Sequence, residues 1–189
     1  LKKLLLKNNY KVIGCYYKKK KFKKIKNVKY LFCDVRKING LRIILNKYKP
    51  NIIFHLAAKS HPYYSFVDPI GTINTNVIGT INLLETCRAL NINSKIVMAC
   101  SSGQYGSRPY SKLPMKENDL YDPEHIYGLS KVFQDSLCKQ YFKMFKLKTI
   151  RAILFNTSGQ GKKFDVFYDI CNQFRKQLPK KKIIIKCGN

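Results

Sequence analysis

The feature that most constrains the fold is an alternation of short apolar runs with longer segments of helical spacing. Apolar runs of about four to eight residues predict strands, and apolar residues three and four positions apart predict helices. Strands are expected at 10–17, 28–33, 51–56, 95–101, 149–155 and 183–185, and helices at 1–9, 38–48, 70–90, 124–145 and 164–178. We therefore predict an α/β fold with a Rossmann-like, doubly wound parallel sheet and helices on both faces.

The composition narrows the class of protein. The 189 residues, 45% of them hydrophobic, suffice for one core of ordinary size. No apolar run reaches the roughly 18 residues that a membrane-spanning helix requires, and the opening segment 1–7 is too short and too rich in lysine for a signal peptide. We therefore expect a cytoplasmic protein with no membrane partner. Its seven cysteines show no Cys-x-x-Cys spacing, so we expect structural cysteines and no metal site.

The net charge of +27 is concentrated toward the amino terminus, where residues 1–50 carry 17 Lys and Arg against the single acid Asp34. Such a surface is compatible with nucleic acid or an anionic membrane as a partner. Lysine, however, outnumbers arginine 31 to 6, and arginine makes the bidentate contacts with phosphates and bases. We favour lysine enrichment of a solvated surface and expect no nucleic-acid partner.

Tyr127 and Lys131 form a candidate proton-transfer pair. Four residues apart on a helix, they share one face and lie within interacting distance. A phenol has a pKa near 10, and a fixed ammonium beside it stabilises the phenolate and lowers that pKa toward the working range. The alternative is a half-buried tyrosine beside a surface lysine. On spacing alone, the pair is a weak signal.

Small or polar residues at the ends of three predicted strands strengthen that signal. Ser101-Ser102 ends one strand, His55-Leu56-Ala57-Ala58 follows another, and Asp34-Val35 follows a third. Open α/β sheets bind ligands beyond the carboxyl ends of their strands. Ser101 could share a proton with a substrate oxygen, the alanines leave room for a flat cofactor, and Asp34 could bind an adenine amine or cap the turn.

Several motifs then occur in an order known from one family. They are His55-Leu56-Ala57-Ala58, Asp68-Pro69, Asn76-Val77-x-Gly79-Thr80-x-Asn82-Leu83-Leu84-Glu85, Ser101-Ser102-x-x-Tyr105-Gly106, Tyr127-Gly128-Leu129-Ser130-Lys131 and Phe155-Asn156. On these residues the chain resembles the extended short-chain dehydrogenases/reductases of the NAD-dependent epimerase/dehydratase type. Within that family it is most similar to the group of GDP-4-keto-6-deoxy-D-mannose reductase and GDP-mannose 4,6-dehydratase.

The resemblance implies a role for each matched position. Ser101, Tyr127 and Lys131 would be catalytic, with Tyr127 delivering a proton to the sugar keto oxygen and Lys131 holding the cofactor ribose and lowering the tyrosine pKa. Ser102 and Asn156 would bind substrate. The cofactor-binding positions would be Asp34, Val35, Leu56, Ala57, Ala58, Asn76, Tyr127, Lys131 and Phe155.

Departures from the family pattern indicate which of the family's activities to expect of this chain. Dehydratases of the family carry Glu two residues after the catalytic Ser or Thr, where this chain has Gly103, so 4,6-dehydration is disfavoured. The resemblance thus implies NADPH-dependent 4-keto reduction of GDP-4-keto-6-deoxy-mannose. Thr157 replaces the usual His after Phe-Asn. The run Tyr16-Tyr17-Lys18 lacks the acid that pairs with an NAD ribose, so NADP(H) is favoured over NAD(H).

The family's first strand and its Gly-rich phosphate loop have no counterpart, because Leu1 aligns partway down the first helix. We therefore expect a fragment truncated at both ends, with weak or no cofactor binding of its own. Residues 1–155 would be a partial NAD(P)-binding domain and 156–189 the beginning of a substrate-binding region. The family also implies a homodimer at full length, through the helices at 70–90 and 124–145.

Other functions stay open. A nucleotide-sugar 4-epimerase or 4,6-dehydratase would use the same residues, and a protein of another class could be a non-catalytic dinucleotide sensor or a basic nucleic-acid binder. Two histidines are expected to lie outside the site. His61 is interpreted as a surface residue, and His125, two residues before Tyr127, is expected to face elsewhere on its helix.

Overall fold

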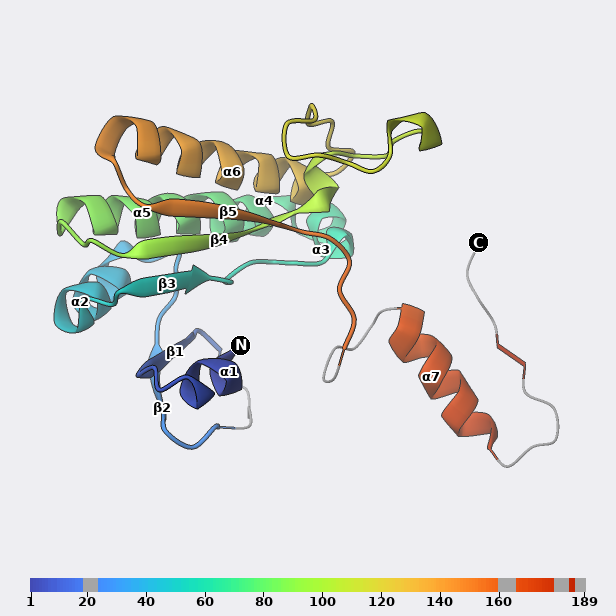
Figure 1. Ribbon diagram of the computed structural model, residues 1–189, viewed down its shortest axis with the longest axis horizontal. Coiled ribbons are helices and arrows are strands. Elements are labelled where there is room, and N and C mark those ends of the chain that lie inside the picture. Colours follow the sequence, from blue (N-terminus) through green and yellow to red (C-terminus); the bar gives the residue numbers. More distant parts are fainter. Residues whose placement is uncertain (19–23, 160–165, 179–183, 186–189) are drawn as a thin grey trace. The chain divides into compact units, whose positions relative to one another are not determined.

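The computed structural model describes residues 1–18, 24–159, 166–178 and 184–185. It divides into two compact units, residues 1–154 and residues 155–189. Among the described residues, the first unit contains every strand and all helices except α7, Val166–Gln177. Figure 1 labels the elements of both units and colours them along the chain, from blue at the amino terminus to red at the carboxyl terminus.

The strands of the first unit are all parallel, as the alternation of elements predicts. β1 (Val12–Tyr16) pairs with β2 (Val28–Phe32), and β4 (Lys95–Ser101) lies between β3 (Ile52–His55) and β5 (Thr149–Leu154). The predicted Rossmann-like α/β class is confirmed. Among the described residues the strands form a two-stranded and a three-stranded sheet rather than one continuous sheet, because β1 and β3 are not hydrogen-bonded to each other.

Most helices lie where the sequence predicts them. The helices of the first unit are α1 (Lys2–Lys7), α2 (Ile38–Tyr48), α3 (Pro62–Val67), α4 (Pro69–Ile73), α5 (Gly79–Ala89) and α6 (Ile126–Phe145), with short 3₁₀ turns at Ser102–Gln104 and Tyr110–Lys112. No helix in the described part of the chain is long and apolar enough to cross a membrane.

Two local features differ from the prediction. The short helix α3 lies in a stretch for which the sequence predicted no helix or strand. The expected helix 70–90 is interrupted by a π-helical turn, Asn74–Ile78, between α4 and α5. Of the expected strand 183–185, residue 183 lies outside the described residues and residues 184–185 have no regular structure; the expected helix start at 164–165 also lies outside them.

The core of the first unit lies between β4 and the helices α5 and α6 (Figure 1), and Leu41 and Leu45 of α2 also belong to it. Leu84 and Cys87 on α5, Ile96 and Met98 on β4, and Cys138 on α6 have no exposed surface. Four of the seven cysteines, Cys33, Cys87, Cys100 and Cys138, belong to this core. They pack as small apolar residues, as expected. Cys15 and Cys171 are exposed, and Cys187 lies outside the described residues.

Gly79 allows α5 to approach the segment that follows β2. A Cβ added there would lie 2.7 Å from Cγ2 and 3.2 Å from Cβ of Val35. We expect Gly79→Ala to lower the free energy of unfolding by about 1–3 kcal/mol, because the backbone or Val35 must move. Urea denaturation measures the change.

The matched control is Gly40→Ala in α2, where the nearest atom to the new Cβ would be Cys33 Sγ at 3.9 Å. That substitution should raise the free energy of unfolding by about 0.5–1 kcal/mol through helix propensity and a less flexible unfolded chain. Equal changes in the free energy of unfolding for the two substitutions would show that Val35 can move aside without destabilising the fold.

Candidate active site

The candidate site lies at the carboxyl ends of β3 and β4. His55, the last residue of β3, pairs with Met98, so that β4 continues past it to Ser101. The Ser101 hydroxyl accepts a hydrogen bond from the Gly103 N–H at 3.2 Å and thereby caps the 3₁₀ turn Ser102–Gln104. Ser101 and Ser102 are both half-buried.

The first turns of α6 bring Tyr127 and Lys131 to the same place. Both are buried, and the Lys131 Nζ lies 5.6 Å from the centre of the Tyr127 ring. A Cβ added to Gly103 would lie 3.5 Å from Ser101 Oγ and 3.7 Å from Tyr127 Cε1. The sequence prediction that these side chains share one site is therefore consistent with the geometry.

The Lys131 ammonium has two acceptors inside the protein. Nζ donates to the carbonyl oxygen of Ala99 at 2.8 Å and to Gln134 Oε1 at 2.7 Å. Burial, which disfavours the charged form, lowers the pKa of Lys131 to about 8. The ammonium is thus held by hydrogen bonds in a place where its charge is costly.

Tyr127 has a pKa above its ordinary value, because burial disfavours the phenolate; a hydrogen bond with Ser101 opposes the effect and is the smaller contribution. Lys131 is not among the groups that shift this pKa here, and the lowering that the family resemblance implies stays a prediction.

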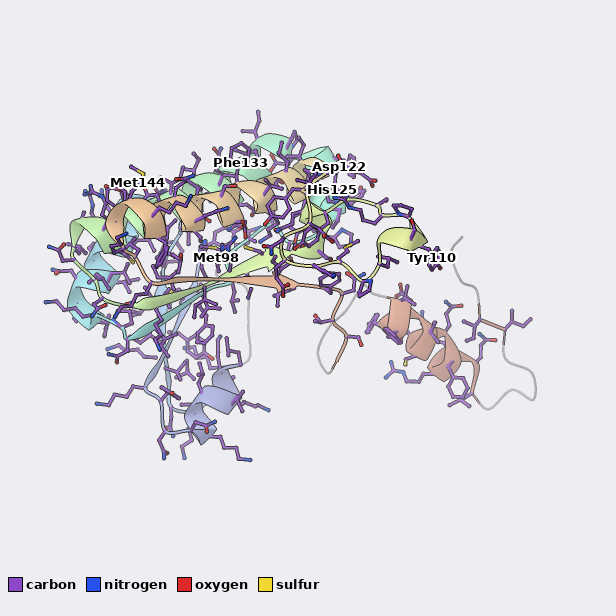
Figure 2. The ribbon with its side chains drawn as sticks, turned by 45° about the horizontal axis from the view of Figure 1, so that its top comes forward. Met98, Tyr110, Asp122, His125, Phe133 and Met144 are labelled. Carbon is purple, nitrogen blue, oxygen red and sulfur yellow. The ribbon has the colours of Figure 1, made fainter. Side chains whose placement is uncertain are left out.

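His125 lies against the site, contrary to the expectation that it faces elsewhere. It precedes the first turn of α6, so helical spacing does not govern its direction. Its Nδ1 accepts from the Gly128 N–H at 2.8 Å as the helix cap. Its ring centre lies 5.8 Å from that of Tyr127, and Figure 2 shows His125 at this end of α6.

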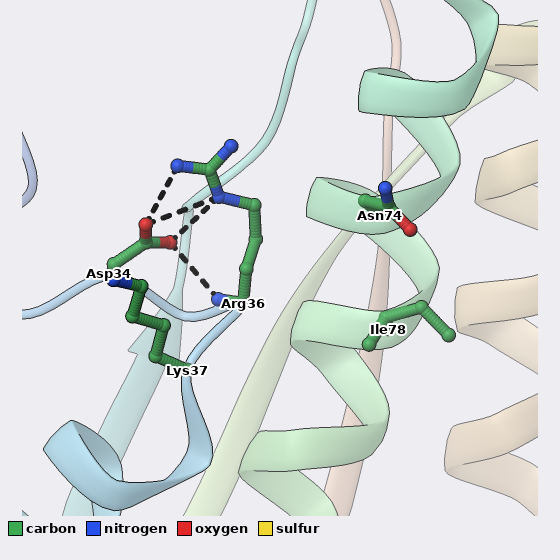
Figure 3. A pocket seen from close by; sticks show the side chains of 5 residues that line it. All are labelled: Asp34, Arg36, Lys37, Asn74 and Ile78. Atoms are coloured by element: carbon green, nitrogen blue, oxygen red, sulfur yellow. Dashed lines mark hydrogen bonds and ion pairs between the residues drawn. The ribbon is translucent and has the colours of Figure 1, made fainter.

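Asp34 lies in a second region, beyond the end of β2. Its carboxylate accepts from Arg36 Nε at 2.9 and 3.1 Å and from Nη2 at 2.6 Å, which lowers the pKa of Asp34 below its ordinary value. A cavity of about 490 Å³ adjoins them, lined by Asp34, Arg36, Lys37, Asn74 and Ile78 (Figure 3). An adenine amine reaching this carboxylate would therefore have to compete with Arg36.

Val35, next to it, is half-buried, and its carbonyl oxygen accepts a hydrogen bond from Asn82 Nδ2 at 2.9 Å. This bond joins the segment after β2 to α5. Asp34 and Val35 are thereby placed beside the helix that also carries Thr80, although β2 itself belongs to the other sheet.

The residues after β3 form an open surface with one buried support. Leu56 and Ala57 are exposed and Ala58 is half-buried. Asn76 is fully buried; its Oδ1 accepts from the Lys59 N–H at 2.8 Å and its Nδ2 donates to Ser130 Oγ at 2.9 Å. Asn76 thus ties this loop to α6, and the cofactor contact that the resemblance implies for it stays a prediction.

Phe155 and Asn156 belong to the second unit and are both exposed there. Their placement beside Tyr127 stays a prediction from the sequence.

Three buried polar residues of the site were missed by sequence reasoning. Gln134 Nε2 donates to Thr80 Oγ1 at 2.7 Å, and His55 Nε2 lies 3.2 Å from the same oxygen. Gln134 follows Lys131 by three residues, so helical spacing was a signal that could have indicated it. No cluster of metal-binding side chains occurs among the residues that the structure describes.

Comparison with known proteins identifies the family to which the chain is similar. The chain matches the family described as GDP-mannose 4,6 dehydratase over residues 1–189. It is 31% identical over 114 residues to the GDP-6-deoxy-D-mannose reductase of Pseudomonas aeruginosa, covering 60% of this chain and 38% of that protein.

Solved structures are similar as well. RMD from Pseudomonas aeruginosa complexed with NADPH has a TM-score of 0.68 at 25% identity, over 78% of this chain and 50% of that one. UDP-glucose 4-epimerase from Brucella ovis in complex with NAD has a TM-score of 0.77 at 25% identity, over 83% of this chain and 48% of that one. The chain spans about half of these solved chains and less of the curated relative.

Proposed function

Because the chain belongs to the GDP-mannose 4,6-dehydratase family, we propose that the protein is an NADPH-dependent reductase of a GDP-4-keto-6-deoxy-hexose. The observation that carries this choice is Gly103. The position beside Ser101 Oγ and Tyr127 Cε1 holds no carboxylate that could help to remove water. Keto reduction needs a single proton donor at the carbonyl oxygen, and Tyr127 supplies one.

Each residue of the candidate site has a defined task in this proposal. The nicotinamide dinucleotide, when bound, supplies the hydride. Tyr127 donates its phenolic proton to the sugar oxygen, and Ser101 donates a hydrogen bond to the same oxygen. Lys131 keeps a positive charge near the phenol, which stabilises the phenolate left after proton transfer.

The residues present fit a dinucleotide. The Lys131 ammonium can donate to ribose hydroxyls, the exposed Ala57 leaves flat space beyond β3, and the cavity beside Asp34 and Arg36 could receive the adenosine end. The preference for NADP(H) over NAD(H) rests on Lys18 and on the missing acid after β1. NADPH in the similar structure from Pseudomonas aeruginosa supports it.

A second copy of the chain is the partner that we propose. Phe133 and Leu129 on α6 and Ile70 on α4 are exposed apolar side chains, and Figure 2 shows Phe133 on the outer side of α6. These helices are the ones through which the family resemblance implies a homodimer.

The activity is tested on the protein that carries this chain at its native length. We expect NADPH oxidation with GDP-4-keto-6-deoxy-mannose, followed by absorbance, and a slower reaction with NADH. GDP-mannose with NADP⁺ serves as the control for dehydration and should give no 4-keto product. Dehydration of GDP-mannose without any reductase activity would refute the proposal.

The 4-epimerase alternative is supported by the similarity to UDP-glucose 4-epimerase. An epimerase returns the hydride to the same sugar and keeps its cofactor. NAD retained through purification, together with interconversion of two sugar nucleotides without net NADPH consumption, would favour it over the reductase.

A further inference from the structure

The Lys131 ammonium is fixed by groups of the protein itself. It is 3% exposed, and its two acceptors are a backbone carbonyl and the side chain of Gln134. A buried ammonium without acceptors would lose its proton or disorder its surroundings. Gln134 therefore contributes directly to where the charge lies.

The orientation of the Gln134 amide follows from its other neighbour. Thr80 Oγ1 donates to its own helix at Asn76 O, 2.6 Å away, so toward Gln134 it can act only as an acceptor. The Gln134 NH₂ must face Thr80, and the amide oxygen must then face Lys131. His55 Nε2, 3.2 Å from Thr80 Oγ1, fills the remaining lone pair as a donor.

The other charged and titratable groups near Lys131 do not replace Gln134. Asp135 on α6 is engaged by Arg151 Nη1 of β5 at 2.9 and 3.2 Å. His55 on β3 is buried and uncharged at neutral pH, since burial and then the charge of Lys131 lower its pKa to about 4. Cys100 on β4 stays a thiol at that pH, because burial raises its pKa to about 12. Tyr127 is likewise protonated before reaction.

We propose that Gln134 is the positioning residue of Lys131: its amide oxygen, oriented by Thr80 and His55, holds the ammonium beside Tyr127 and keeps it charged. As a neutral acceptor, it stabilises the positive charge without cancelling it. The inference rests on the proposed function only in giving Lys131 a catalytic task. The arrangement of the ammonium itself can be tested without activity.

The first experiment follows the titration of Lys131 by NMR on protein labelled with ¹³C-lysine, with Lys131→Arg to assign the signal. Gln134→Met keeps the volume and removes the acceptor, so the pKa of Lys131 should fall by about one pH unit. Gln134→Glu adds a carboxylate and should raise it. Gln140→Met, at an exposed position on the same helix, should leave it unchanged. Thr80→Val, which frees the amide to rotate, should shift it downward by less than Gln134→Met does.

The second experiment measures kcat/KM against pH for the same variants. Activity that needs the ammonium is lost as pH rises through the pKa of Lys131, so that limb should move to lower pH in Gln134→Met and to higher pH in Gln134→Glu. If Gln134→Met and Gln134→Glu shift the pKa of Lys131 in the same direction, or if neither shifts it, the inference is wrong and Gln134 is a packing residue. Opposite NMR shifts in a protein without reductase activity would support the positioning role and refute the proposed function.

Discussion

Replacing Tyr127 by phenylalanine should lower kcat for keto reduction by about 10²–10⁴-fold, the usual contribution of a positioned general acid. The substitution removes one oxygen from a buried ring that packs against His125 and near Gly103. The fold and the binding of the sugar nucleotide should therefore persist, and KM should change little. Steady-state kinetics with NADPH and the 4-keto substrate measure the loss.

Tyr141→Phe is the matched control for this experiment. Tyr141 is on the same helix, is half-buried, and donates from its hydroxyl to Glu85 Oε2 at 3.1 Å, on the surface of α5. Its replacement should leave kcat within about twofold of wild type while removing a hydrogen bond worth about 1 kcal/mol. Activity of Tyr127→Phe equal to that of Tyr141→Phe would exclude Tyr127 as the proton donor.

The buried His55 should make the fold sensitive to acid. Burial lowers its folded-state pKa to about 4, whereas the unfolded chain titrates near 6.5. The unfolded state thus takes up the proton first, and stability present above pH 6.5 is lost as the pH falls toward 4. The difference of about 2.5 pH units corresponds to about 3 kcal/mol.

Urea denaturation across this pH range measures the effect in wild type and in His55→Asn, which keeps a donor for Thr80 but does not titrate. The variant will be less stable near neutral pH, because a smaller side chain fills the site. It should nevertheless lose about 3 kcal/mol less than wild type on acidification. His61→Asn, at an exposed helix cap, is the control for replacing a histidine by asparagine at the surface. If wild type and His55→Asn lose equal amounts of stability as the pH falls, other groups cause the acid sensitivity.

Regular elements could be predicted where the sequence pattern is long enough to show its period. The helix 38–48 and the strand 95–101 agree with the structure at both ends, and the pair Tyr127 and Lys131 lies on one helix face as its spacing requires. The helix α3 was missed because its six residues are too few to show a period. Pro62 at its first position, after His61 as cap, was the available signal.

The other features of the candidate site depend on tertiary packing, which the pattern of a single sequence does not show. His125 lies one residue before α6, where helical spacing does not apply, and its cap bond turns the ring toward Tyr127. The position of the Lys131 charge depends on Gln134 and Thr80, which are 54 residues apart in the chain. A pairing over such a separation has no periodic trace in a single sequence. The same applies to Asn76 and Ser130.

The four cysteines of the core give the chain an internal chemical reporter of unfolding. Burial raises the pKa of Cys87, Cys100 and Cys138 to about 12, and alkylating reagents react with the thiolate rather than the thiol. At neutral pH these sulfurs become reactive only when β4, α5 and α6 separate. The exposed Cys171 carries no such protection. The rate of thiol labelling, resolved by peptide mass, would therefore separate opening of the core from exposure of the surface.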